Sequence, residues 1–313
     1  MTDPARQVYA DEGAAKVATG ADDSSDGPAP PSAAELAAHH GLRRSAARLP
    51  LSDYVRELWA RRHFIVAFAS ARNIAVYTNA RLGQVWQVLT PLLNAAVYYL
   101  VFGLIIKTRG GIPNYIAFLV IGIFIFTYTQ RSVLSGSKAI NGNLDLIRAL
   151  HFPRATLPFA YTIIELQQLA ISMVVMLAIV LATGEPVTLA WLLIAPALLL
   201  QTLFNVGASL FVARLAAKVT DVTQLLPFIL RTWLYVSGVF YSIAFFTKGA
   251  PKAVQTILEA NPGAVYIEII RKALLQDHDT AGPIWVYAVV WAVVAFVGGF
   301  LYFYRAEETY GRG

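Results

Sequence analysis

The chain has 313 residues, of which 57% are hydrophobic and 14% are charged, and its formal net charge at pH 7 is +6. A soluble domain carries roughly 25% charged residues, so this composition predicts an integral membrane protein and excludes an ordinary soluble fold. There is no cysteine, which excludes disulfides and thiolate chemistry. The chain has 25 Lys and Arg against 19 Asp and Glu, and in so apolar a chain this excess indicates basic segments beside membrane spans and no nucleic-acid partner.

Residues 1–42 predict no packed structure. They are rich in Ala, Asp, Ser, Gly and Pro and poor in large apolar residues, which is the composition of a disordered segment. Acids occur early and no apolar core follows them, so the stretch is not a signal peptide. We therefore expect a disordered cytoplasmic tail.

Residues 43–85 form a basic approach to the first apolar run, with eight arginines against two acids. Ser52 is the expected N-cap of a helix in which Val55, Leu58 and Trp59 recur at helical spacing. Such a helix suits the cytoplasmic membrane surface, with its apolar face in lipid and its arginines near anionic headgroups. A soluble surface helix is the alternative.

Six apolar runs reach the roughly 20 helical residues that a bilayer core requires. They cover residues 86–106, 115–134, 157–181, 189–212, 225–246 and 284–304. Transmembrane strands would alternate in polarity over about ten residues, and these runs are continuous, so we expect an all-α membrane protein with a six-span domain over residues 86–304. The basic approach to the first run predicts that both termini, including the short tail 305–313, are cytoplasmic, although Lys107 and Arg109 oppose this bias.

The loop at residues 141–160 differs from its apolar surroundings. Asn143 is a plausible N-cap, and Asp145 is favourable in the first turn of the helix that follows. Pro153 ends this helix, and Pro158 lies in the first turn of the third run, where proline is tolerated. The pattern predicts a short cytoplasmic helix that is stiffly connected to the third span.

Residues 247–283 are expected outside the membrane, between the fifth and sixth runs. Asn261, Pro262 and Gly263 form a turn between two short amphipathic helices that are too short and too charged to span. We expect this helical hairpin to lie on the outer leaflet or to dip into it. An ordinary extracellular hairpin and a gate over a pore both fit the pattern.

Several kinds of chemistry have no motif in this chain. It contains no GxxxxGK[ST] phosphate-binding loop and no HExxH metal motif. Arg131, Glu165 and Arg231 are the ionisable residues within the predicted spans, and they are either functional or paired within the bundle. An ion-driven transporter would show acids or broken helices near the midplane, and this signature is missing.

Aromatic residues with polar neighbours mark two of the predicted spans. The first span has Asn94, Tyr98 and Phe102 on one face, and the fifth has Trp233, Ser237, Phe240 and Tyr241. Rings pack on the apolar faces of sugars while hydroxyl and amide groups meet sugar hydroxyls, so such faces can line a path for a glycan. Packing between helices is the alternative.

Three stretches resemble the ABC-2 type permeases that export cell-surface polysaccharides. The loop after the second run is similar to the family pattern N-x-x-L-I-x-x-x-x-F-P-R-x-x-L-P, through Asn143, Leu146, Ile147, Phe152, Pro153, Arg154, Leu157 and Pro158. The start of the first run resembles L-G-x-x-W-x-x-L-x-P-L, through Leu82, Gly83, Trp86, Leu89, Pro91 and Leu92. A weaker match comprises Asn261, Pro262 and Arg271. The family often has Arg-Asp after its fourth span, whereas this chain has Thr220 before Asp221, so no role is assigned to an arginine there.

The resemblance implies a dimer of two copies, with twelve membrane helices and two separate ATP-binding subunits that would hold ATP and Mg. This chain itself would have no catalytic residue and no bound cofactor or metal. The substrate would be a polysaccharide on an undecaprenyl-type pyrophosphate, exported across the bacterial plasma membrane. The Ala- and Arg-rich composition is similar to the branch that exports cell-wall galactan, while O-antigen, capsule and teichoic acid exporters share the motifs.

The resemblance also assigns residues to roles. The coupling helix, which contacts the ATP-binding subunit, would comprise Asn143, Leu144, Asp145, Leu146, Ile147 and Arg148, followed by Phe152, Pro153 and Arg154. The channel would be lined by Asn94, Tyr98, Phe102, Trp233, Ser237, Phe240 and Tyr241. The pyrophosphate would be received by Arg61, Arg62 and Arg72. The rival readings are a membrane-embedded enzyme acting on lipid-linked sugars and an ABC-2 permease for a small lipid or drug.

Overall fold

A computed structural model describes residues 49–78, 85–105, 112–150, 152–276 and 283–310, together with Leu36, His39 and His278. Every regular element in these described residues is a helix and none is a strand, which confirms the expected all-α class. The chain divides into two units, Met1–Ala47 and Arg48–Gly313, and the description that follows concerns the second. The prediction of a disordered tail over residues 1–42 falls almost entirely outside the described residues.

Five helices in the described part of the chain are long and apolar enough to cross a membrane, so the protein is a multi-pass membrane protein. They are α4 (Val85–Tyr98) with its π-helical extension Tyr99–Ile105, α5 (Tyr115–Ser137), α7 (Thr156–Ala182), α8 (Ile194–Lys218) with the preceding 3-10 turn Leu189–Leu193, and α13 (Ile284–Tyr304). They agree with five of the six predicted runs to within a few residues, because a long apolar helix is the simplest way to satisfy backbone groups in lipid.

The fifth predicted run is not one helix, so the expectation of a continuous span over residues 225–246 was wrong. The run is divided between α9 (Val222–Val236) and the short α10 (Ile243–Phe246). Between them Gly238 adopts a left-handed backbone conformation with φ of 65°. Glycine tolerates this conformation at no steric cost, and it ends a helix by turning the chain out of the helical path.

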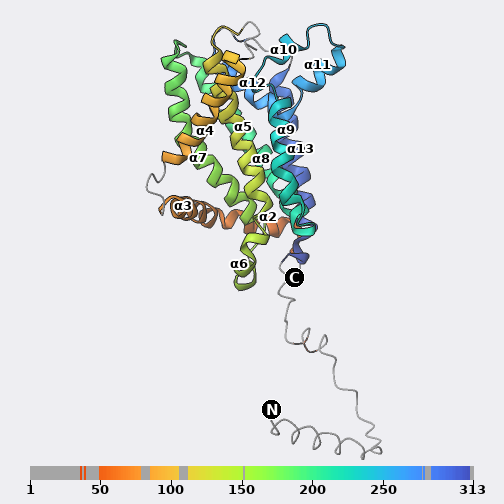
Figure 1. Cartoon of the computed structure of the whole chain (residues 1–313). Coiled ribbons are helices and arrows are strands. Elements are labelled where there is room, and N and C mark those ends of the chain that lie inside the picture. The colour runs from red at the N-terminus through yellow and green to blue at the C-terminus, as the bar shows by residue number, and fades with distance from the viewer. Residues whose placement is uncertain are drawn as a thin grey trace, which may run out of the picture. The chain divides into compact units, whose positions relative to one another are not determined.

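The helices α4, α7, α8 and α9 pack against α5, which is buried along most of its length, and α13 packs on α8 (Figure 1). The closest helix pair is α8 and α13, which touch backbone to backbone at Gly207 and Gly299. A Cβ atom at Gly299 would lie 2.1 Å from the Gly207 carbonyl oxygen, so a larger residue does not fit there. Small residues of this kind allow membrane helices to approach closely where no water is present to drive association.

At the lower end in Figure 1, α2 (Leu51–Ala60) and α3 (Arg62–Thr78) lie across the ends of the spans, and α6 (Leu144–Ala149) projects beyond them. The helix α2 begins at Leu51 after Pro50 and has no side-chain cap, so the expectation that Ser52 caps it was wrong. Tyr54 and Leu58 form its buried face, while Trp59 is 70% exposed. The helix α2 is therefore amphipathic as predicted: Tyr54 lies on the face that packs against the protein, and Trp59 lies on the exposed face.

At the opposite end, α11 (Lys252–Glu259) and α12 (Pro262–Leu274) correspond to the predicted hairpin. Asn261 is the N-cap of α12, and its side chain accepts a hydrogen bond from the backbone of Gly263. The hairpin was expected to lie on the outer leaflet or to dip into it; α12 is buried among α5, α8 and α13, whereas α11 has no buried residue. Most of α12 is apolar, and the buried guanidinium of Arg271 donates to backbone carbonyl oxygens and pairs with Glu268, while the other basic residue, Lys272, is exposed.

Candidate functional site

The candidate site begins with α6, where Asp145 and Arg148 are exposed at the end of the molecule that carries α2 and α3. Ile147 is only 7% exposed and packs into an apolar cluster with residues of α2, α3, α7 and the chain after α13. The helix therefore turns one flank to the protein and a charged flank outward. Leu144 and Leu146 are half-buried between these two flanks.

Asn143 occupies the predicted N-cap position, but its side chain does not cap the helix. The side chain is buried, and its Nδ2 donates to the carbonyl oxygen of Ala139 at 2.8 Å and to the hydroxyl of Tyr161 at 3.1 Å. Its Oδ1 accepts from Arg72 Nη1 at 3.4 Å. Instead of capping α6, the Asn143 side chain joins the start of α6 to α3, to α7 and to the residues just after α5.

The residues after α6 connect it to α7 and to distant segments. The Phe152 ring lies 6.0 Å from the ring of Phe64 on α3, and Pro153 is buried. The backbone N–H of Arg154 donates to Oε1 of Glu307 at 2.8 Å, and its guanidinium donates to the Glu307 carbonyl oxygen. Sequence reasoning missed Glu307, because its only signal is a pair of acids just beyond the last span.

The three arginines predicted to receive pyrophosphate do not converge. Arg61 is exposed and lies 4.0 Å from Glu57, while Arg62 donates to the carbonyl of Trp59 at 3.2 Å and lies over its ring. Arg72 lies about 15 Å further along α3, given a rise of about 1.5 Å per residue. There its guanidinium lies 5.2 Å from the ring of Tyr161, as well as contacting Asn143.

The predicted channel aromatics separate into two groups. The rings of Tyr98 and Phe102 lie 4.6 and 4.7 Å from that of Phe240, which is itself buried, while Asn94 on the same helix is exposed. Because Phe240 is enclosed in this chain, the surface left for a ligand belongs to α4.

The second group holds the N-terminus of α12. The indole of Trp233 donates to Oδ1 of Asn261 at 2.7 Å, and Nδ2 of Asn261 donates to the buried hydroxyl of Ser237 at 3.2 Å. Tyr241 lies apart, with its ring 4.9 Å from that of Phe246. These contacts give Trp233 and Ser237 a structural role, while a lining role for the set stays a prediction.

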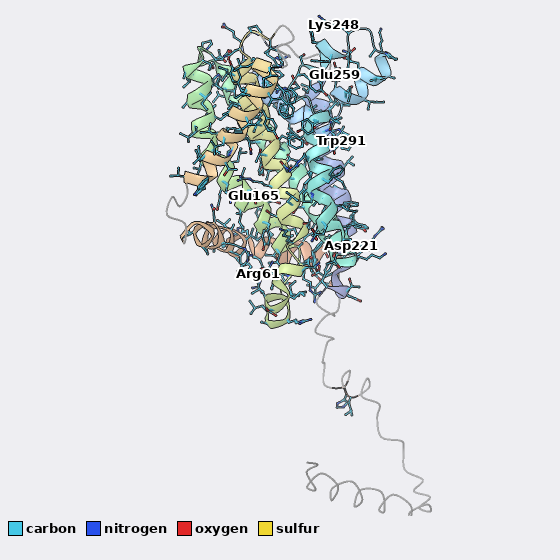
Figure 2. The ribbon with its side chains drawn as sticks, in the orientation of Figure 1. Arg61, Glu165, Asp221, Lys248, Glu259 and Trp291 are labelled. Atoms are coloured by element: carbon cyan, nitrogen blue, oxygen red, sulfur yellow. The ribbon has the colours of Figure 1, made fainter. Side chains whose placement is uncertain are left out.

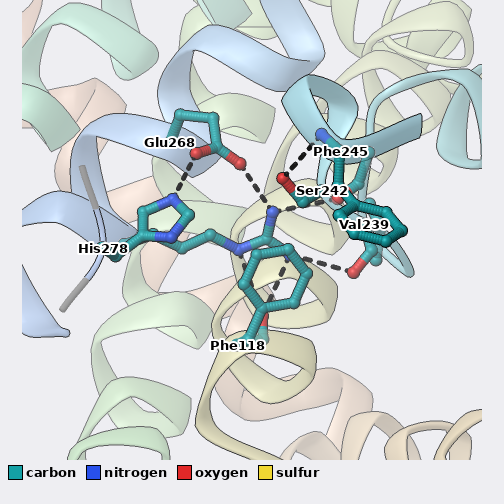
Figure 3. A network of polar contacts seen from close by, with 8 residues as sticks. Phe118, Val239, Ser242, Phe245, Glu268 and His278 are labelled. Carbon is teal, nitrogen blue, oxygen red and sulfur yellow. Dashed lines mark hydrogen bonds and ion pairs between the residues drawn. The ribbon is translucent and has the colours of Figure 1, made fainter. Parts of the chain in front are cut away.

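Arg271 is fully buried at the end of the bundle that carries α12, opposite α6, and donates to four acceptors (Figure 3). These are the carbonyl oxygens of Phe118, Gly238 and Val239 and the carboxylate of Glu268, which is 2.7 Å away. The second oxygen of Glu268 lies 2.5 Å from Nε2 of His278. Burial alone would raise the pKa of Glu268, but Arg271 and His278 outweigh it and hold that pKa below its ordinary value. The network fixes the turn that follows α9.

Glu165 and Arg131 lie in the spans, with Glu165 near the middle of the bundle in Figure 2. The hydroxyl of Ser135 donates to Glu165 Oε1 at 2.6 Å, and Arg131 donates to Gln168 at 3.0 Å. Arg131, Glu165 and Gln168 line a cavity of about 20 Å³, which has room for one water molecule. Among the described residues no group of three His, Cys, Asp or Glu could hold a metal ion. Both side chains are thus hydrogen-bonded within the bundle, and a functional role for them stays a prediction.

Comparison with known proteins places this arrangement in a family. Residues 65–275, from α3 to the end of α12, match the ABC-2 type transporter family. The chain is 25% identical over 256 residues to the O-antigen export system permease protein RfbA of Myxococcus xanthus, which covers 81% of this chain and 96% of that protein. It is also 25% identical over 192 residues to the protein of the same name from Klebsiella pneumoniae, covering 61% of this chain and 72% of that one. The family match spans more than half of the chain, and the chain belongs to the ABC-2 type transporter family.

Proposed function

We propose that this chain is the permease subunit of an ATP-driven exporter of lipid-linked polysaccharide. The family membership and the relatives named as O-antigen export permeases carry this proposal. The substrate is a glycan on an undecaprenyl-type pyrophosphate, which is moved outward across the bacterial plasma membrane. Galactan, O-antigen and teichoic acid are the chemical classes of glycan that an exporter of this family would carry.

The ATP-binding subunit docks on α6 and supplies ATP and Mg. The exposed flank of α6 with Asp145 and Arg148 supports this assignment, because charged side chains at a projecting helix offer directional contacts to a partner. The buried flank with Ile147 anchors the helix to the permease. Displacement of α6 then reaches α7 through the short connection that contains Pro153.

Six crossings, with both ends cytoplasmic, fit the contacts at the lower end of the bundle. Tyr54 precedes the first span and Glu307 follows the last one, and their side chains are hydrogen-bonded at 2.9 Å. Two segments on one side of a membrane require an even number of crossings between them, and the five long helices make an odd number. The sixth crossing is α9, which is about 22 Å long at 1.5 Å per residue and is extended by the turn and α10.

The bilayer and a second copy of the chain cover the remaining apolar surfaces. Trp59, Val66 and Ile74 are exposed on α2 and α3, as expected for helices that lie on the cytoplasmic surface of the membrane. Both α4 and α9 expose large apolar side chains, and two copies that meet along these helices would enclose a path between them. Arg61 and Arg62 at the start of α3 are the proposed receivers of the pyrophosphate, and Arg72, which contacts Asn143 and Tyr161, would be the third.

The test is ATP hydrolysis and association in lipid, with the ATP-binding subunit added to the purified chain. We expect the chain alone to hydrolyse no ATP and the complex of the chain with the ATP-binding subunit to hydrolyse it. We expect Arg148→Glu to weaken the association of the two proteins. Lys138→Glu is the matched control, because Lys138 is also exposed at this end but lies outside α6. The buried Ile147 is unsuitable for the test, because its replacement would disturb folding.

Each rival function gives a different result in the same preparation. A membrane-embedded enzyme would modify a lipid-linked sugar without any ATP-binding subunit. A permease for a small lipid or drug would associate with the subunit, and that substrate rather than a lipid-linked glycan would stimulate ATP hydrolysis.

A further inference from the structure

The side chain of Glu307 joins three segments that are far apart in the sequence. It lies in the 3-10 turn Glu307–Thr309 just after α13, and it is only 7% exposed. Its Oε2 accepts from the Tyr54 hydroxyl of α2 at 2.9 Å, and its Oε1 accepts from the backbone N–H of Arg154 at 2.8 Å. The Tyr54 oxygen in turn accepts from the N–H of Ala155 at 3.2 Å. One carboxylate therefore fastens α2 and the exit from α6 to the end of α13.

Packing alone would not require a carboxylate at this position. Burial raises the pKa of Glu307 above its ordinary value, and the bonds from Arg154 and Tyr54 offset only part of that rise. A buried acid is costly, and hydrogen bonds to it are directional, so they hold the three segments in one orientation where apolar contacts would let them slide. The Tyr54 ring also lies 5.1 Å from that of Tyr304, whose hydroxyl donates to the Leu49 carbonyl at 2.6 Å.

The bonds of Glu307 can transmit a displacement of α6 to other helices. On its C-terminal side, α6 is connected along the chain to one membrane helix, α7. Displacement of α6 reaches α7 along the chain through Pro153 and Thr156. It reaches α2 and α13 across contacts, and the strongest of these on the exit side are the bonds of Arg154 and Ala155 to Glu307 and Tyr54. Loss of these bonds would leave α6 and α7 moving without the helix on the membrane surface.

We propose that Glu307 is a positioning residue for transport, which makes α2, the exit from α6 and the end of α13 move as one block. The transport role of this block rests on the proposed function, in which an ATP-binding subunit pushes on α6. The joining of α2 to α6 does not depend on that subunit, so it can be tested separately.

The chain has no cysteine, so two spin labels can be placed by Arg56→Cys on α2 and Leu150→Cys directly after α6, both at exposed positions and away from the flank that holds Asp145 and Arg148. The distance distribution between them is measured in the full chain in lipid, alone and with the ATP-binding subunit in its nucleotide-free and ATP-trapped states. Glu307→Leu removes the acceptor at similar volume, Tyr54→Phe removes one hydroxyl, and Glu308→Leu is the exposed control.

We expect a narrow distribution in the parent chain that is unchanged by ATP, and a broader one in Glu307→Leu and Tyr54→Phe. In the complex, both variants keep ATP hydrolysis, while glycan export per ATP falls by about tenfold, as for one lost bond to a charged acceptor. Glu307→Gln, which can still accept from Arg154, restores part of the export, and Glu308→Leu behaves as the parent.

Distributions as narrow in Glu307→Leu and Tyr54→Phe as in the parent chain alone would overturn the proposal, whatever the partner does. Broadened distributions with unchanged export per ATP would also overturn it, since the block would then be irrelevant to transport. A parent chain that associates with no ATP-binding subunit, yet shows the expected distances, would instead overturn the proposed function and with it the transport role of the block.

Discussion

Replacing Arg271 by methionine tests whether the buried network around α12 holds the fold together. The side chain is 0% exposed and donates to three carbonyl oxygens and to Glu268, so no water takes its place. Removing one partner of a buried ion pair costs about 3–5 kcal/mol, because the other charge stays buried after losing its counter-charge. Glu268 would retain His278 as a neighbour. The orphaned carbonyls add to this cost, since each unsatisfied buried group costs about 1–3 kcal/mol when nothing relaxes.

We therefore expect Arg271→Met to lower the free energy of unfolding by at least about 3 kcal/mol, which corresponds to a fall in Tm of roughly 10 °C in a domain of this size. The assay is thermal unfolding of the purified chain in detergent, followed by tryptophan fluorescence. Lys272→Met is the control, because the next residue is exposed. Glu268→Leu combined with Arg271→Met should recover part of the loss, since it removes the uncompensated acid.

A Tm for Arg271→Met equal to that of Lys272→Met would refute this reasoning. So would a double variant that is no more stable than Arg271→Met, because the cost is assigned to the stranded carboxylate. The double-mutant cycle separates this term from the loss of the three carbonyl bonds.

Three further predictions concern pH, helix packing and the start of α6. The pKa of Glu268 is lowered in the folded chain, so the stabilisation from its carboxylate is present above the ordinary pKa of 4.5 and is lost as the pH falls through the lower folded value. The fall in Tm below pH 4.5 should therefore be smaller in Glu268→Gln than in the parent chain. Gly299→Ala should prevent the packing of α13 on α8, because the new Cβ would meet the Gly207 carbonyl. A Cβ at Gly298 has nothing within 4 Å, so Gly298→Ala should be neutral or stabilising by up to about 1 kcal/mol. Equal yields of folded protein from the two variants would contradict this packing. Asn143→Leu should cost about 1–3 kcal/mol by orphaning buried acceptors, and a Tm unchanged from the parent chain would show that its bonds are dispensable.

Residues 247–283 show why similar composition can hide different placements. The sequence predicts two short charged helices separated by a turn, and this pattern does not distinguish a pair at the membrane surface from a pair in which one helix is buried in the bundle. The burial of α12 depends on Arg271 finding carbonyl oxygens of Phe118, Gly238 and Val239, of which Phe118 is 153 residues away. A charged residue in a sequence predicts an exposed side chain unless its buried partners are known. For Arg271 the carbonyl partners lie outside α12.

The candidate site was predictable in outline and not in its contacts. The motif around Asn143 identified the short helix and its connection to α7, because these depend on local backbone preferences, but the helix ends at Ala149, before the end predicted at Pro153. The burial of Ile147 and the use of the Asn143 amide as a junction depend on neighbours from α3 and α7. The same reasoning explains the channel aromatics, since only packing decides that Phe240 is enclosed and Asn94 is exposed.

Long apolar runs and ordered motifs were sufficient to establish a helical membrane protein and its family, because lipid leaves a chain few ways to satisfy its backbone and each run meets that demand by itself. The division of the fifth run at Gly238, the insertion of α12 and the meeting of Tyr54, Arg154 and Glu307 depended on the folded arrangement. Partners separated by 153 and 253 residues leave no periodic signal in the sequence, and they come together only when the helices that carry them pack.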